Sequence, residues 1–154
     1  MRRALALCAI VVVACSKSDQ KADTTPPAAA TPTPAPAAAP AIALADVAGT
    51  WEGQVMPMGK DTVVTTATMI NTATMDGWTM KLPNGATPAV KVESVAGDSI
   101  IATAGPFPSA VRKGQQVTTH SIIRLQDGKL MSTVHAKYAN GDTTTYRIVA
   151  TKKP

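Results

Sequence analysis

Cysteine is scarce in this chain. Only Cys8 and Cys15 occur among 154 residues, so everything after residue 15 lacks a thiol. That absence excludes a disulfide, a thiolate metal site or a cysteine nucleophile in the remaining chain. Aromatic residues make up 3% of the chain, and the net charge of +5 is not gathered in one cluster. A nucleic-acid groove needs a basic stripe or a stacking surface, so nucleic acid is disfavoured as a partner.

The short motifs that mark common active sites are also missing. The sequence has no Gly-x-Ser-x-Gly elbow, His-Glu-x-x-His helix, phosphate loop or dinucleotide fingerprint. After residue 44 the only carboxylates are two glutamates and six aspartates, and most of these aspartates adjoin expected turns. This distribution favours turn chemistry over paired acid–base catalysis. We therefore expect no enzymatic activity, no catalytic residue and no cofactor.

The N-terminus has the three parts of an export signal. Arg2 and Arg3 give it a positive start, residues 4–13 form an uncharged apolar stretch, and small Ala14 precedes Cys15. The apolar stretch is too short to span a bilayer, which needs roughly 20 such residues. We therefore predict a signal peptide over residues 1–14.

The segment Val12-Val13-Ala14-Cys15 resembles the lipobox of bacterial lipoproteins. The resemblance implies that Cys15 is acylated, with chains such as palmitate, and becomes the new N-terminus. Acyl chains contribute about 0.8 kcal/mol per buried CH₂, so they would hold the protein on a membrane without a spanning helix. Ser16 stands where an Asp in related lipoproteins favours inner-membrane retention, which implies an outer-membrane anchor facing the periplasm. The alternative is an ordinary cleaved signal in which Cys15 is incidental.

Low-complexity sequence rich in proline and alanine follows the cysteine. It includes the run Ala30-Thr31-Pro32-Thr33-Pro34-Ala35-Pro36. Such a segment cannot bury enough apolar surface to fold, so we predict a disordered linker over 15–44. At about 3.1 Å per residue, a fully extended linker of this length would reach roughly 90 Å.

Residues 45–154 are long enough for one domain. Runs rich in Val, Ile and Thr recur there between turn signals such as Asp127-Gly128 and Asn140-Gly141, without a helical period. This pattern predicts an all-β domain, a small antiparallel up-and-down barrel or half-barrel of about eight strands. The expected strands are 48–57, 61–71, 77–82, 88–95, 98–104, 115–126, 129–138 and 142–152.

Alternation along the expected strands assigns the two faces. In the first strand Trp51 and Val55 share the inward face, and in the last strand Tyr146, Ile148 and Ala150 do so. One face is thus apolar and the other polar, as expected of a small barrel.

The run Asp46-Val47-Ala48-Gly49-Thr50-Trp51 resembles the Gly-x-Trp start of lipocalins and their bacterial lipocalin-like relatives. The resemblance implies a barrel that binds a small apolar or amphipathic molecule, with Trp51 at its floor and a basic residue of the last strand over the indole. Parity places Lys152 on the inward series and leaves Arg147, the alternative, outward. The domain is shorter than a typical lipocalin, and a C-terminal helix and the Thr-Asp-Tyr-like motif are missing.

The alternative is that Trp51 is a core anchor of a packed module. Such a module would have a structural or protein-interaction role in the cell envelope, with an envelope protein as its partner. A cavity large enough for a ligand would separate the two interpretations.

The longest expected loop is 105–114, which carries the only phenylalanine, Phe107. Folded over a barrel mouth, Phe107 would cap an apolar ligand while Arg112 or Lys113 meets an acidic head group. The alternative is a proline-stiffened connection with Phe107 packed on the barrel.

Two further patterns concern metals. A type I′ turn at Asp127-Gly128 would place His120 opposite His135. Zinc ordinarily takes three or four protein ligands, so we expect two solvated histidines and no metal site. Met56 and Met58 follow Trp51 in a Met-x-Met pattern similar to that of periplasmic copper carriers, because thioethers suit Cu(I). A Cu(I) carrier is therefore a further alternative, although methionine more often fills core gaps.

Overall fold

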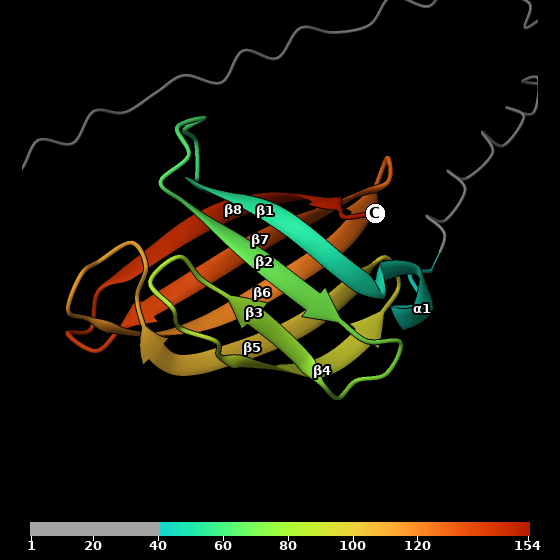
Figure 1. Ribbon diagram of the computed structural model, residues 1–154, viewed down its shortest axis with the longest axis horizontal. Helices are drawn as coiled ribbons and strands as arrows, with labels where there is room; N and C mark the ends of the chain where they lie inside the picture. The colour runs from blue at the N-terminus through green and yellow to red at the C-terminus, as the bar shows by residue number, and fades with distance from the viewer. Residues whose placement is uncertain (1–40) are drawn as a thin grey trace, which may run out of the picture. The chain divides into compact units, whose positions relative to one another are not determined.

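The computed structural model describes residues 41–154 (Figure 1). The predicted signal peptide, the lipidation site Cys15 and the linker up to residue 40 lie outside the described residues. The elements follow in the order α1 (Leu44–Val47), β1 (Gly49–Pro57), β2 (Thr65–Asn71), β3 (Trp78–Lys81), β4 (Ala89–Ala96), β5 (Ser99–Pro108), β6 (Gln116–Gln126), β7 (Lys129–Tyr138) and β8 (Thr143–Lys152).

The strands form a closed up-and-down barrel. Each strand pairs antiparallel with the next, and β8 pairs with β1 so that Trp51 lies opposite Lys152. Closure gives every strand a partner on both sides, so the sheet has no terminal edge strand. The pairing is shortest between β3 and β4, where it covers two positions. The predicted all-β fold of about eight antiparallel strands is confirmed, and the barrel is closed.

The predicted alternation is also confirmed. Trp51 and Val55 of β1, and Tyr146, Ile148 and Ala150 of β8, are all buried. Their neighbours in sequence face outward because successive side chains of a strand point to opposite faces. The interior therefore holds one continuous apolar core.

The turn between β6 and β7 sets the register of the two strands. Asp127 and Gly128 have φ angles of 50° and 71°, as a type I′ turn requires. Leu125 consequently pairs with Leu130. The register predicted from the Asp-Gly dipeptide is correct.

Strand β5 is longer than predicted, so the loop expected to begin at residue 105 begins at Ser109. The register between β5 and β6 shifts between Ala104 and Phe107, and Gly105 lies within this bulge at φ +114°. A Cβ on Gly105 would lie 2.6 Å from the carbonyl oxygen of Val117, so only glycine fits. The bulge lets the strand continue past a Gly-Pro pair that suggests a strand end.

The start of the barrel also differs from the prediction. Leu44 begins α1, and both Ile42 and Leu44 pack against the core, although the sequence assigned them to the linker. The Asp46 carboxylate accepts a hydrogen bond from the Ala43 N–H at 3.1 Å, which secures the first turn. Within residues 41–154, no helix is long and apolar enough to cross a membrane.

The barrel has two different ends, which we call the floor and the mouth. Helix α1 and the end of β8 lie at the same end, the floor (Figure 1). Antiparallel order places the short turns that follow β2, β4 and β6 at this end as well. The mouth is formed by the other four connections, which are 58–64, 82–88, 109–115 and 139–142.

Candidate functional site

Val47 of α1 closes the floor. Its side chain is 0% exposed, and its carbonyl oxygen accepts hydrogen bonds from Trp51 Nε1 at 2.8 Å and Asn71 Nδ2 at 3.3 Å. Both donors are buried, so each would carry a desolvation penalty without this partner. One backbone oxygen thus ties α1 to β1 and β2 and seals this end.

At the floor, the lack of a side chain at Gly49 lets Lys152 reach the ring of Trp51. Gly49 has φ +124°, and a Cβ there would lie 2.8 Å from Lys152 Cε. The lysine can therefore cross β1, and its Nζ lies 5.6 Å from the centroid of the Trp51 ring, within cation–π range. Arg147, the alternative basic residue, faces outward and pairs with Asp61 at 2.8 Å.

Above the floor, a cavity of about 100 Å³ lies inside the barrel and reaches the mouth. Four of the inward side chains around it are alanines, and two flexible methionines, Met69 and Met80, line it as well. None of the residues that line this cavity is Asp, Glu, Lys, Arg or His. The alanines are Ala67, Ala102, Ala104 and Ala136.

Ser132 brings a buried hydroxyl to this apolar wall. Its side chain lies on β7 between Ile123 of β6 and Ile148 of β8, and it is 5% exposed. Its Oγ has no hydrogen-bond partner in the described part of the chain. Buried polar atoms in proteins are rarely left unpaired, so an unpaired hydroxyl in the wall of this cavity is unusual.

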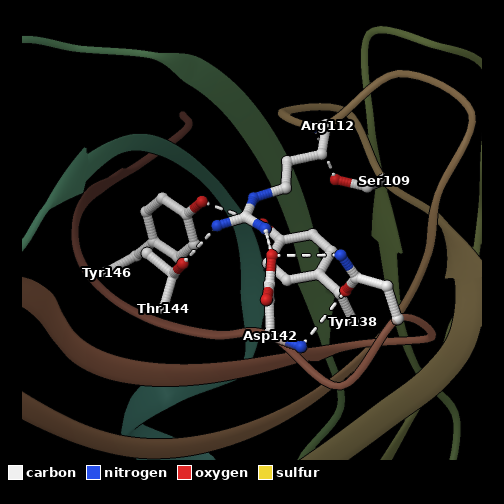
Figure 2. Close-up of polar contacts among 7 residues, drawn as sticks. Ser109, Arg112, Tyr138, Asp142, Thr144 and Tyr146 are labelled. Atoms are coloured by element: carbon white, nitrogen blue, oxygen red, sulfur yellow. Dashed lines mark hydrogen bonds and ion pairs between the residues drawn. The ribbon is translucent and has the colours of Figure 1, made fainter.

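A polar cluster lies at the mouth, and Figure 2 shows the Arg112 guanidinium at its centre. The hydroxyl groups of Tyr138 and Tyr146, which both line the cavity, are 2.8 Å apart. The Arg112 guanidinium carbon lies 4.1 Å from the centroid of the Tyr138 ring. Arg112 also donates to Asp142 at 2.7 Å and to Thr144 at 3.0 Å. The cation thus has partners on three sides.

The protonation of this cluster follows from its surroundings. Burial, together with the hydrogen bond to Tyr138, raises the pKa of Tyr146 to about 12, so its hydroxyl stays neutral at physiological pH. A hydrogen bond from Asn140, with a second from Arg112, lowers the pKa of the Asp142 carboxyl. The carboxylate of Asp142 is therefore charged and holds Arg112 in place.

The β5–β6 loop is held in a compact conformation over the cavity. The hydroxyl of Ser109 accepts hydrogen bonds from the backbone N–H groups of Val111 and Arg112, at 3.1 and 2.9 Å. The Ser109 N–H donates to the Gln115 carbonyl at 2.8 Å, which closes the base of the loop. Ala110 and Val111 consequently line the outer part of the cavity.

The structure separates the residues that the sequence assigned to ligand binding. Phe107 is 7% exposed and lines the cavity. Arg112 lies at the mouth, where its guanidinium is already hydrogen-bonded to Asp142. Lys113 is exposed and does not line the cavity. Trp51 and Lys152 form the floor and do not line the cavity.

Sequence reasoning did not single out Ser132, Tyr138 or Tyr146 as site residues. A signal was present for all three, because parity within β7 and β8 puts them on the inward series with Val134 and Ile148. Nothing in that alternation distinguishes a side chain that borders a cavity from one that is packed.

The residues weighed for metal binding do not line the cavity. His120 and His135 pair across β6 and β7 as predicted, with ring centroids 6.4 Å apart, and His135 Nδ1 is 3.2 Å from Thr145 Oγ1. Met56 is buried beside Arg147, whereas Met58 is half exposed. Across residues 41–154, no group of three His, Cys, Asp or Glu side chains is arranged to hold a metal ion.

Fold and site together define a closed eight-stranded antiparallel barrel with an apolar internal cavity and a tyrosine–arginine cluster at its mouth. Comparison of the chain with protein-family models, curated proteins and solved structures finds no match.

Proposed function

We propose that this protein binds a small apolar or amphipathic molecule inside its barrel. The observation that carries the proposal is the cavity of about 100 Å³ with its largely apolar wall. Binding sites for drug-sized ligands usually measure about 300–1,000 Å³, so the occupant is small. A dry apolar cavity of about 150 Å³ is known to take up benzene, so a single-ring molecule bound here would extend from the cavity toward its opening at the mouth.

The side chains around the cavity suit an adaptable site. The alanines leave space that larger residues would fill, and Met69 and Met80 can change conformation at low cost. Access is at the mouth, because the floor is sealed by Val47 and Trp51. A fully packed interior would leave no such space, which favours ligand binding over a packed module of the cell envelope.

The proposed location of this function is the periplasmic side of the outer membrane, through a lipid anchor on Cys15. Support for it comes from the charge, apolar stretch and lipobox-like segment of the first fifteen residues. Likewise, the proposal of a lipocalin-like relationship rests on Gly49 and Trp51. Labelling of cells with radioactive palmitate tests the anchor, since Cys15→Ser should abolish incorporation into this protein. Equal labelling of both chains would overturn it.

Methionine methyl groups offer a direct test of ligand binding. Two of them, on Met69 and Met80, line the cavity, whereas those of Met58 and Met75 are exposed. In the full chain labelled with ¹³C at the methionine methyls, added toluene should shift the first two NMR signals saturably. The signals of the exposed pair should stay in place, which makes them internal controls.

A filled cavity provides the matched variant. Ala136→Leu adds volume inside the barrel and should abolish the shifts, at a stability cost of about 1–3 kcal/mol from overpacking. Thr133→Leu, on the outer face of the same strand, should bind toluene like the original chain. If toluene moves neither Met69 nor Met80, the ligand-binding proposal fails and the packed module is favoured. Shifts of Met56 and Met58 on addition of Cu(I) would favour the copper carrier instead.

A further inference from the structure

The hydroxyl of Ser132 makes no hydrogen bond that would stabilise the described part of the fold. Its neighbours across the sheet are Ile123 and Ile148, so the surrounding wall would accept an alanine or a valine without loss of any hydrogen bond. The hydroxyl is desolvated by burial and is unpaired within residues 41–154. Such a group carries a penalty that a partner inside the cavity would remove.

Three of the other hydroxyl groups that line the cavity are engaged, whereas that of Ser121, on the inward face of β6, belongs to a side chain that is only partly buried. The hydroxyls of Tyr138 and Tyr146 bond to each other at 2.8 Å, and Thr119 Oγ1 donates to the Ala104 carbonyl at 3.5 Å. Gln115 Oε1 is also buried and unpaired, but Gln115 does not line the cavity. Ser132 is thus the buried, unpaired side-chain group of the described chain that borders the cavity.

The cavity offers nothing that would neutralise a charge. No acidic or basic side chain lines it, and the nearest cation at the mouth, Arg112, is bonded to Asp142 and Thr144. An ion buried in an apolar site without a partner is strongly disfavoured. An acidic head group at the mouth would compete with the Asp142 carboxylate for Arg112.

From this arrangement we infer that the barrel selects a neutral, compact molecule with one hydrogen-bonding group, such as a small alcohol, phenol or ketone, and that Ser132 binds this group. The inference rests on the proposed ligand-binding function and narrows its chemical class. The polar group of the ligand lies in mid-barrel beside Ser132, and its apolar part contacts Met69, Met80 and the alanines.

Phenol and toluene are matched probes for this inference, because they have similar shapes and differ by a hydroxyl in place of a methyl. The titration follows the methyl signals of Met69 and Met80 in the full chain. Ser132→Ala should weaken phenol binding by about 3- to 10-fold and leave toluene within about two-fold, because one net hydrogen bond is lost. Ser94→Ala, at an exposed position of β4, is the control and should change neither affinity. Benzoate should give no saturable shift at neutral pH.

The outcomes separate this inference from the proposed function. If toluene binds and Ser132→Ala leaves the phenol-to-toluene affinity ratio unchanged, the role of Ser132 is overturned while the ligand-binding function stands. Benzoate binding tighter than phenol would overturn the selection for neutral molecules. If none of the three probes moves the Met69 and Met80 signals, the ligand-binding function itself fails.

Discussion

The floor and the mouth of this barrel are built from different side chains. The largest fully buried residues are Val47, Trp51, Trp78, Ile100 and Leu130, and each belongs to α1 or lies within two residues of a strand end at the floor. Toward the mouth the inward positions include Ala67 and Ala136 as well as Phe107 and a hydrogen-bonded tyrosine pair. Large buried side chains contribute most to stability, whereas small ones leave space. The barrel therefore separates stability from binding along its axis.

Substitution of Trp51 should produce the largest effect. Trp51→Ala removes a ring that is 2% exposed, together with its bond to the Val47 carbonyl, and should lower the free energy of unfolding by about 3–5 kcal/mol. Trp51→Phe keeps a ring beneath Lys152 and should cost less. Urea unfolding measures both. A loss below about 1 kcal/mol for Trp51→Ala would show that the floor is not the stable end.

A matched pair of valines compares the two ends directly. Val47→Ala at the floor should cost about 2 kcal/mol, because a fully buried side chain loses two methyl groups. Val111→Ala at the mouth, where the side chain is 37% exposed, should cost less than about 0.5 kcal/mol. Equal losses in the same unfolding assay would contradict the division of the barrel into two ends.

The tyrosine pair at the mouth should have a smaller effect, with a distinctive pH dependence. Tyr146→Phe removes the bond to the Tyr138 hydroxyl and should cost about 1 kcal/mol near neutral pH. The pKa of Tyr146 is about 12 in the folded chain and near 10 when unfolded. Its stabilising contribution is thus complete below pH 10 and is lost as the pH rises toward 12, because the unfolded chain releases its proton first. As the pH rises from 10 toward 12, the free energy of unfolding should fall less for Tyr146→Phe than for the original chain. An equal fall in both chains would contradict the burial of this hydroxyl.

The smallest effect is expected at Asp142, which is exposed to solvent. Its pKa is lowered by hydrogen bonds from Asn140 and Arg112, so its carboxylate stabilises the fold above the unfolded pKa near 3.9. That contribution disappears as the pH falls through the lower, folded value. Asp142→Asn should therefore be slightly less stable than the original chain at neutral pH and equally stable in acid. A difference that persists in acid would show that the Arg112 contact is not its cause.

Much of the barrel wall could be predicted from the sequence because strand alternation is a local property. The period of two placed Trp51 and Tyr146 inward, and the Asp127-Gly128 dipeptide fixed the register of β6 with β7. The continuation of β5 to Pro108 was missed because the bulge at Gly105 depends on the close approach of the Val117 carbonyl from another strand. Helix α1 was missed because it has only four residues, too few for a helical period.

The site was harder to predict because a cavity depends on the whole interior. The sequence points to Phe107 because it is the only phenylalanine, and Phe107 does line the cavity. The sequence does not reveal that Arg112 pairs with Asp142, because the two residues are 30 positions apart and meet only where the β7–β8 connection returns to the mouth. Ser132 looked like an ordinary inward position, since its isolation follows from the volumes of side chains on other strands.

The two tryptophans lie at different places in the barrel, so the fluorescence of each can report on its own surroundings. Trp51 is sealed at the floor beneath Lys152, whereas Trp78 borders the cavity and donates to the Thr72 and Thr74 carbonyls. In Trp51→Phe the remaining indole reports on the cavity, and in Trp78→Phe it reports on the floor. Fluorescence of these two variants would therefore time the filling of the cavity and the opening of the floor as separate events, without any added label.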